Sequence, residues 1–154
     1  MAELKYWVWL STHENVKPMT LKLLLDRFES PEKIYFAREN EYREISGITE
    51  NAIMSLKNKS MSEANRIIDF CETKGYKILT LQDAAYPARL RSISAPPVVL
   101  YVRGTLPVID DEAAVAIVGT RRCTPYGRVQ AERIGYEVAK GGALVVTGLA
   151  AGVD

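Results

Sequence analysis

The feature that most constrains the fold is a pair of apolar segments that each end in a glycine-containing loop, with one helical segment between them. Residues 114–119 read AVAIVG, residues 143–148 read ALVVTG, and residues 124–140 have the pattern of a helix. Two apolar strands joined by a helix are typical of a βαβ unit, in which the strands are parallel. The sequence therefore predicts an α/β fold with a parallel sheet.

The helical segment carries signals for both of its ends. Thr124 can cap the helix, Pro125 suits its first position, and two glycines follow at residues 141 and 142. Arg128 and Glu132 have the spacing of an exposed i, i+4 pair. The face against the sheet is expected to consist of Gly127, Ala131, Ile134 and Val138.

The first 75 or so residues have helical periodicity. One apolar face is formed by Leu21, Leu24, Leu25 and Phe28. Thr20 is a candidate N-cap for that helix, and Ser30 with Pro31 begins the next one. Gly75 ends the last helix, and the spacing of that helix places Cys71 toward the core. We expect a small all-helical domain at residues 1–75.

From residue 76 the pattern changes to that of strands. Residues 76–83 have a β-like period, and residues 98–104 (VVLYVRG) form a β-branched and aromatic run that is typical of a buried strand. The irregular stretch between them contains three prolines and one short helix at about residues 88–93. We therefore expect a second domain at residues 76–154, which contains the beginning of the parallel sheet.

The two glycine-containing loops are the candidate binding site. The carboxyl ends of parallel strands share one edge of a sheet, and ligands bind at that edge in doubly wound folds. A helix N-terminus and arginines favour phosphate, while glycines let a ligand approach the backbone. The predicted phosphate-binding residues are Gly119, Thr120, Arg121, Arg122, Thr124, Gly148, Leu149, Ala150 and Gly152.

The motifs argue against several classes of enzyme. The first loop matches neither the G-x-G-x-x-G dinucleotide fingerprint nor a P-loop, so an NAD site is not expected. No residues have the spacing of metal ligands. The single histidine, His13, lies far in sequence from the loops, and we interpret it as a surface or cap residue. The sequence predicts a protein that is not an enzyme and has no catalytic residues, metal or cofactor.

The cellular setting follows from cysteine usage and from the apolar segments. The two cysteines, Cys71 and Cys123, do not form a disulfide framework, which indicates a reducing compartment. The N-terminus lacks the pattern of a signal peptide, and no stretch approaches the length of a membrane span. We expect a cytoplasmic protein with no membrane partner.

Three stretches in this order, YPARLRSISAPPVVLYVRG, VAIVGTRRCTPYG and VVTGLAAGVD, resemble the DNA-processing protein A family, also called the Smf family. The resemblance is close over residues 76–154 and looser before them. It implies a SAM-like, degenerate helix-hairpin-helix domain followed by an extended Rossmann-like sheet. It also implies single-stranded DNA binding and loading of the RecA recombinase during natural transformation.

The resemblance also implies how the two loops are used. The family's G-S/T-R loop, here Gly119, Thr120 and Arg121, and its G-L-A-x-G-[IV]-D stretch, here residues 148–154, line a single-strand pocket. Phosphates would meet the helix N-terminus and arginine, while bases splay or stack. The family's sequence continues past the final aspartate, so we expect an N-terminal fragment, with self-association belonging to the full-length protein.

The helical domain departs from the family pattern, and two alternatives stay open. HENVKPMT lacks the hairpin glycines and ISGITE keeps only Gly47, so we expect this domain to pack or bind a partner rather than grip DNA. One alternative is a nucleotide-phosphate-binding enzyme of the phosphoribohydrolase-like Rossmann group, which also holds phosphate with strand-end loops. The other is a helical interaction module attached to a vestigial sheet.

Overall fold

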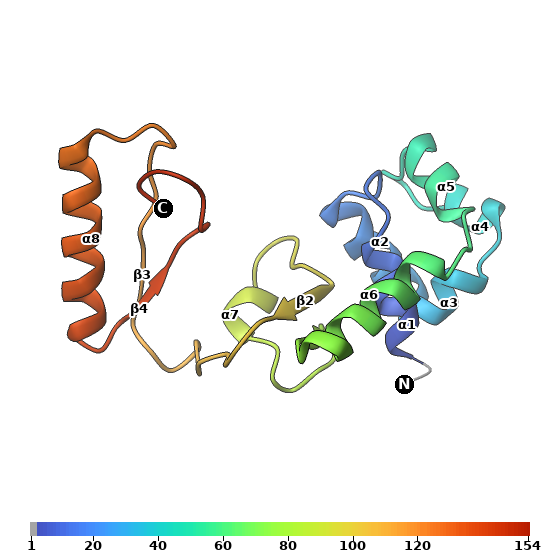
Figure 1. Cartoon of the computed structure of the whole chain (residues 1–154). Coiled ribbons are helices and arrows are strands. Elements are labelled where there is room, and N and C mark those ends of the chain that lie inside the picture. Colours follow the sequence, from blue (N-terminus) through green and yellow to red (C-terminus); the bar gives the residue numbers. More distant parts are fainter. Residues whose placement is uncertain (1–2) are drawn as a thin grey trace. The chain divides into compact units, whose positions relative to one another are not determined.

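The computed structural model describes residues 3–154, which divide into two compact units (Figure 1). The first unit ends at Leu106 and the second runs from Pro107 to Asp154. The described helices of the first unit that precede its strands end at Lys74, where the sequence predicts the end of the helical domain. The division into compact units falls after Leu106, so residues 76–106 belong to the first unit. The placement of a domain boundary at residue 75 stays a prediction.

The first unit combines short helices with an antiparallel hairpin. Its described elements are α1 (Leu4–Ser11), α2 (Pro18–Phe28), α3 (Pro31–Phe36), α4 (Glu39–Arg43), α5 (Glu50–Leu56), α6 (Ser62–Lys74), β1 (Lys77–Thr80), α7 (Ala88–Arg91) and β2 (Val99–Val102). Strands β1 and β2 pair antiparallel, with Lys77 opposite Val102 and Thr80 opposite Val99. The expected strands and the short helix between them are therefore present.

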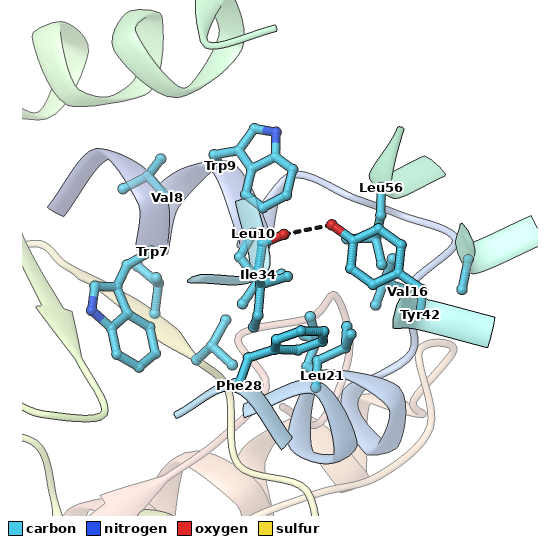
Figure 2. Close-up of a cluster of buried hydrophobic side chains, with 14 of the residues drawn as sticks. Trp7, Val8, Trp9, Leu10, Val16, Leu21, Phe28, Ile34, Tyr42 and Leu56 are labelled. Atoms are coloured by element: carbon cyan, nitrogen blue, oxygen red, sulfur yellow. Dashed lines mark hydrogen bonds between the residues drawn. The ribbon is translucent and has the colours of Figure 1, made fainter. Parts of the chain in front are cut away.

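Helix α1 is the centre of the first unit's core. Residues 6–10 (YWVWL) are all buried, which is typical of a helix surrounded by other elements rather than one lying on a surface. Figure 2 shows Trp9 and Leu10 among side chains from other helices, including Phe28 and Tyr42. The Tyr42 hydroxyl donates a hydrogen bond to the backbone oxygen of Ile34, which satisfies a polar group inside the core.

Most of the predicted helix signals are confirmed in the first unit. Ser30 Oγ accepts a hydrogen bond from the Lys33 amide at 3.2 Å, and Gly75 ends α6 with φ +67°. Cys71 is buried, as its spacing predicts. The N-cap prediction for Thr20 is wrong, because α2 begins earlier at Pro18, and Thr20 is buried inside the helix. Proline at the first helical position favours the earlier start.

The second unit is a βαβ arrangement. It contains β3 (Ala114–Ala116), α8 (Pro125–Lys140) and β4 (Leu144–Val146). Strands β3 and β4 pair in parallel, with Val115 opposite Val145. The predicted cap of α8 is confirmed, since Thr124 Oγ1 accepts a hydrogen bond from the Gly127 amide at 3.1 Å. The fold class is α/β, with the parallel strands and crossover helix of a Rossmann-like sheet.

The face of α8 toward the strands differs from the prediction at one position. Ile134 is 51% exposed, so it does not belong to the buried face. Gly135 takes the close position instead, because a Cβ there would lie 3.5 Å from Cδ1 of Ile117. The expected Arg128–Glu132 pair is also absent from the ion pairs of the described residues. Both of these side chains line a cavity instead.

Candidate nucleic-acid interface

The loops that follow β3 and β4 touch one another at the carboxyl edge of the parallel pair. The Val153 amide donates a hydrogen bond to the Thr120 backbone oxygen at 3.2 Å. The Gly119 amide donates to Oδ1 of Asp154 at 2.8 Å. These two bonds join residues that are more than thirty positions apart in the sequence. The sheet edge therefore brings together both halves of the predicted site, as parallel pairing requires.

Glycine is needed where the loops approach most closely. A Cβ at Gly152 would lie 2.1 Å from the Thr120 backbone oxygen and 2.7 Å from Cα of Arg121. Gly152 also has φ +108°, a conformation that side-chain-bearing residues rarely adopt. A Cβ at Gly119 would lie 2.7 Å from Cβ of Val153. The glycines therefore allow the backbones of the two loops to touch each other, in addition to letting a ligand approach the backbone.

Thr147 closes the second loop on itself. Its hydroxyl donates a hydrogen bond to the Asp154 backbone oxygen at 3.0 Å and lies 3.3 Å from the Leu149 amide, whose proton it accepts. Asp154 in turn holds the Gly119 amide through its side chain. A single chain of hydrogen bonds therefore connects the tip of the second loop with the start of the first.

The first loop presents positive charge. Arg121 and Arg122 are exposed, and neither forms an ion pair with another described residue. Thr120 Oγ1 accepts a hydrogen bond from the Arg122 amide at 3.2 Å, which shapes the turn between β3 and α8. Asp154 is the acidic residue at the loop junction, and its Oδ1 already accepts the Gly119 amide proton. Two guanidinium groups are therefore free to meet an anion.

The predicted site residues fall into two groups by location. Gly119, Thr120, Arg121 and Arg122 lie in the exposed loop after β3, and Thr124 caps α8. In the second loop, Gly148 and Leu149 are exposed, whereas Ala150 and Gly152 are half-buried. The structure brings the two groups into contact through Gly152, so the candidate site is one continuous surface of two loops.

A cavity of about 280 Å³ lies between α8 and the second loop. Its lining includes Arg128, Glu132, Tyr136, Thr147, Gly152 and Asp154. Among the predicted site residues, only Gly152 lines it. Sequence reasoning missed the position of Arg128, although its spacing from Ala131 and Gly135 places all three on one helical face. The remaining predicted residues form an open surface rather than this cavity.

His13 is a core residue of the first unit, so its interpretation as a surface or cap residue is wrong. Its side chain is buried, its Nδ1 lies 3.0 Å from Ser55 Oγ, and its Nε2 has no hydrogen-bond partner. Burial, aided by the positive charge of Lys59, lowers the pKa of His13 to about 4. The ring is therefore neutral at pH 7, and it packs against Trp9 with 4.6 Å between ring centroids.

Lys59 lies in a cage of aromatic rings within the same unit. Its Nζ lies 5.0 to 5.3 Å from the ring centroids of Trp9, Tyr35 and Tyr42, and it donates a hydrogen bond to the Tyr42 hydroxyl at 2.7 Å. Burial lowers the pKa of Lys59 to about 8. This lysine is engaged in internal cation–π contacts, so we assign it to the core rather than to a phosphate contact.

Within residues 3–154, no group of three or more His, Cys, Asp or Glu side chains is placed to hold a metal ion. None of the helices in this part of the chain is both long enough and apolar enough to cross a membrane.

The parallel strands, the crossover helix and the two loops in contact at the sheet edge are the features of a Rossmann-like fold. The sequence model of the DNA recombination-mediator protein A family matches residues 77–154, about half of the chain. The chain belongs to this family. The resemblance to the DNA-processing protein A family is thereby confirmed, and it places the chain among proteins of DNA recombination and processing.

Two curated relatives support the assignment. Protein Smf of Synechocystis is 33% identical over 161 residues, an alignment that covers 99% of this chain and 39% of Smf. DNA processing protein DprA of Bacillus subtilis is 32% identical over 89 residues, covering 58% of this chain and 30% of DprA. The chain therefore spans less than two fifths of the length of either relative.

Proposed function

We propose that the chain binds single-stranded DNA through the loops that follow β3 and β4. The observation that carries this proposal is the contact of Gly152 with the backbone of Thr120 and Arg121. That contact fixes a glycine-rich backbone beside two arginines that have no ion-pair partner among the described residues. Exposed guanidinium groups beside exposed loop backbone suit the phosphates of a nucleic acid strand.

The size of the charged surface favours a single strand over a duplex. The formal net charge of the chain is only +1, and the cations free of ion pairs in the first loop are Arg121 and Arg122. Non-specific duplex binding depends on many phosphate contacts over a broad basic surface. An unpaired strand is flexible enough to follow two short loops, and its base faces are available for further contacts.

We further propose the biological role that the family suggests. The chain would be part of a mediator that loads a RecA-type recombinase on single-stranded DNA during DNA uptake, in the cytoplasm and without chemistry of its own. The single histidine, the residue type that acts most often as a general base, is buried in the first unit and does not lie in the loops. Recombinase loading and self-association are proposed for the whole protein, because this chain aligns with only 39% of the Smf relative.

A nucleotide-binding enzyme of the phosphoribohydrolase-like group is the alternative. The cavity beside α8, with Arg128 and Glu132 in its lining, is the observation in its favour. A nucleotide monophosphate in this cavity would be held by Arg128 rather than by Arg121. The first proposal therefore predicts that substitution of Arg121 weakens ligand binding, whereas the alternative predicts this effect for substitution of Arg128.

The test is fluorescence anisotropy of a labelled 20-nucleotide oligothymidine over a salt series, with the wild-type chain, Arg121→Ala and a matched Arg133→Ala control on α8. We expect binding that weakens with salt, a five- to tenfold loss for Arg121→Ala, and a shallower salt slope by about one. Arg133→Ala should stay within about twofold of the wild type. No binding, or equal losses for both variants, contradicts the proposal, and binding or cleavage of a nucleotide monophosphate that depends on Arg128 favours the enzyme.

A further inference from the structure

We infer that Leu149 contacts the unpaired bases of the bound strand, an inference that rests on the proposed function. Leu149 is 88% exposed, the largest exposed fraction among the large apolar side chains of the described chain. It lies in the second loop, which contacts the Arg121 loop directly through Gly152. An apolar side chain with this exposed fraction makes little contact with the described chain, so it is available to a ligand of the same two loops.

The backbone of Leu149 is also unusual. Its φ is +52°, the left-handed conformation that is unfavourable for leucine and ordinary for glycine or asparagine. The other described non-glycine residue with positive φ is Glu29, which ends helix α2, where this conformation is common. Leu149 ends no helix. Strain kept at an exposed residue is typical of a binding site.

Specific contacts hold Leu149 in this conformation. Thr147 Oγ1 accepts the hydrogen bond from the Leu149 amide and donates to the Asp154 backbone oxygen. A Cβ at Gly148 would lie only 3.0 Å from Oδ2 of Asp154, so glycine is favoured immediately before Leu149. The same Asp154 carboxylate holds the amide of Gly119. The leucine is therefore carried by the hydrogen-bonded network that also positions the Arg121 loop.

The chemistry of the side chain identifies what it touches. A leucine offers nothing to a phosphate, whereas it can pack against the flat face of a base. Every base has such a face, so this contact tolerates any sequence. In a duplex the faces are stacked inside and cannot be reached from the edge. Leu149 would thus supply the preference for unpaired over paired strands, while Arg121 supplies the attraction to phosphate.

The experiment compares two labelled 20-mers, oligothymidine and an abasic oligomer with the same phosphate backbone, each titrated with the chain. We expect the wild type to prefer oligothymidine about fivefold, and Leu149→Ala to abolish that preference without weakening abasic binding. Leu149→Asn, which tolerates the left-handed conformation, should behave like Leu149→Ala. Val108→Ala, at another exposed apolar residue of the second unit, is the matched control and should keep the preference.

The outcomes separate this inference from the proposed function. If the wild type binds both oligomers equally and Arg121→Ala weakens both, the loops bind phosphate and the role of Leu149 is refuted. If Leu149→Asn keeps the wild-type preference, or if Leu149→Ala weakens abasic binding as much as oligothymidine binding, the side chain has no base contact. If the wild type binds neither oligomer, the proposed function fails and this inference fails with it.

Discussion

A single methyl group should be enough to separate the two loops. In Gly152→Ala, the new Cβ would lie 2.1 Å from the Thr120 oxygen and 2.7 Å from Cα of Arg121, both backbone atoms that no side-chain rotation can move. The residue would also keep φ +108°. The positive φ costs about 1–2 kcal/mol, and displacing packed atoms costs about 1–3 kcal/mol more. The contact should lose about 3 kcal/mol of stability, which raises the equilibrium constant for its opening roughly a hundredfold.

Two other glycines separate the contributions. Gly142 has φ +88° with no atom within 4 Å of an added Cβ, so Gly142→Ala carries the backbone cost alone, about 1 kcal/mol. Gly119 has no positive φ, but an added Cβ would lie 2.7 Å from Cβ of Val153. Gly119→Ala should therefore carry the packing cost alone, about 2 kcal/mol. The destabilisation by Gly152→Ala should therefore be close to the sum of the destabilisations by Gly142→Ala and Gly119→Ala.

The assay is amide hydrogen exchange at Val153, whose proton is bonded to the Thr120 oxygen. Protection should fall about a hundredfold in Gly152→Ala and about fivefold in Gly142→Ala, and single-stranded DNA affinity should fall only in the variants that separate the loops. Both tryptophans lie in the first unit, so their fluorescence in urea should not change. Equal protection in the Gly152 and Gly142 variants would refute the close approach of the two backbones.

Three further predictions concern pH and helix capping. Because the unfolded His13 protonates near 6.5 and the buried ring only near 4, stability should fall by up to about 3 kcal/mol as pH drops through this window, and His13→Leu should flatten the decline in urea unfolding. For Lys59, whose folded pKa is about 8, stability should rise between pH 8 and about 10.5, and an unchanged slope in Lys59→Met would contradict the cage. Thr124→Ala should destabilise α8 by about 1 kcal/mol, measured by exchange of the Gly127 amide, with Thr124→Ser as the control that keeps the bond.

Local signals account for the parts of the fold that the sequence predicts well. The caps at Ser30 and Thr124 and the stop at Gly75 depend on neighbouring residues, so their chemistry is visible in a short stretch. The parallel pairing of β3 and β4 follows from the helix between them. At Thr20 two local signals competed, and the proline two positions earlier prevailed over the threonine as the start of the helix.

Long-range contacts account for what the sequence left unpredicted. His13 contacts Ser55, which lies 42 positions away in the sequence, so the residues next to His13 do not predict this contact. The exposure of Ile134 depends on which turn of α8 meets Ile117, and Gly135 makes that approach. In the candidate site, the glycine spacing predicted a bare backbone at Gly152. The contact between Gly152 and the Thr120 carbonyl depends on the pairing of β3 with β4.

The central claim is that the loops after β3 and β4 form the surface that meets single-stranded DNA. The most direct measurement is an amide chemical-shift titration of the isotope-labelled chain with a short oligothymidine. We expect the largest shifts at residues 119–122 and 148–152, with the indole signals of Trp7 and Trp9 unmoved in the core of the first unit. Shifts confined to the first unit, or none at saturating oligonucleotide, would contradict the account.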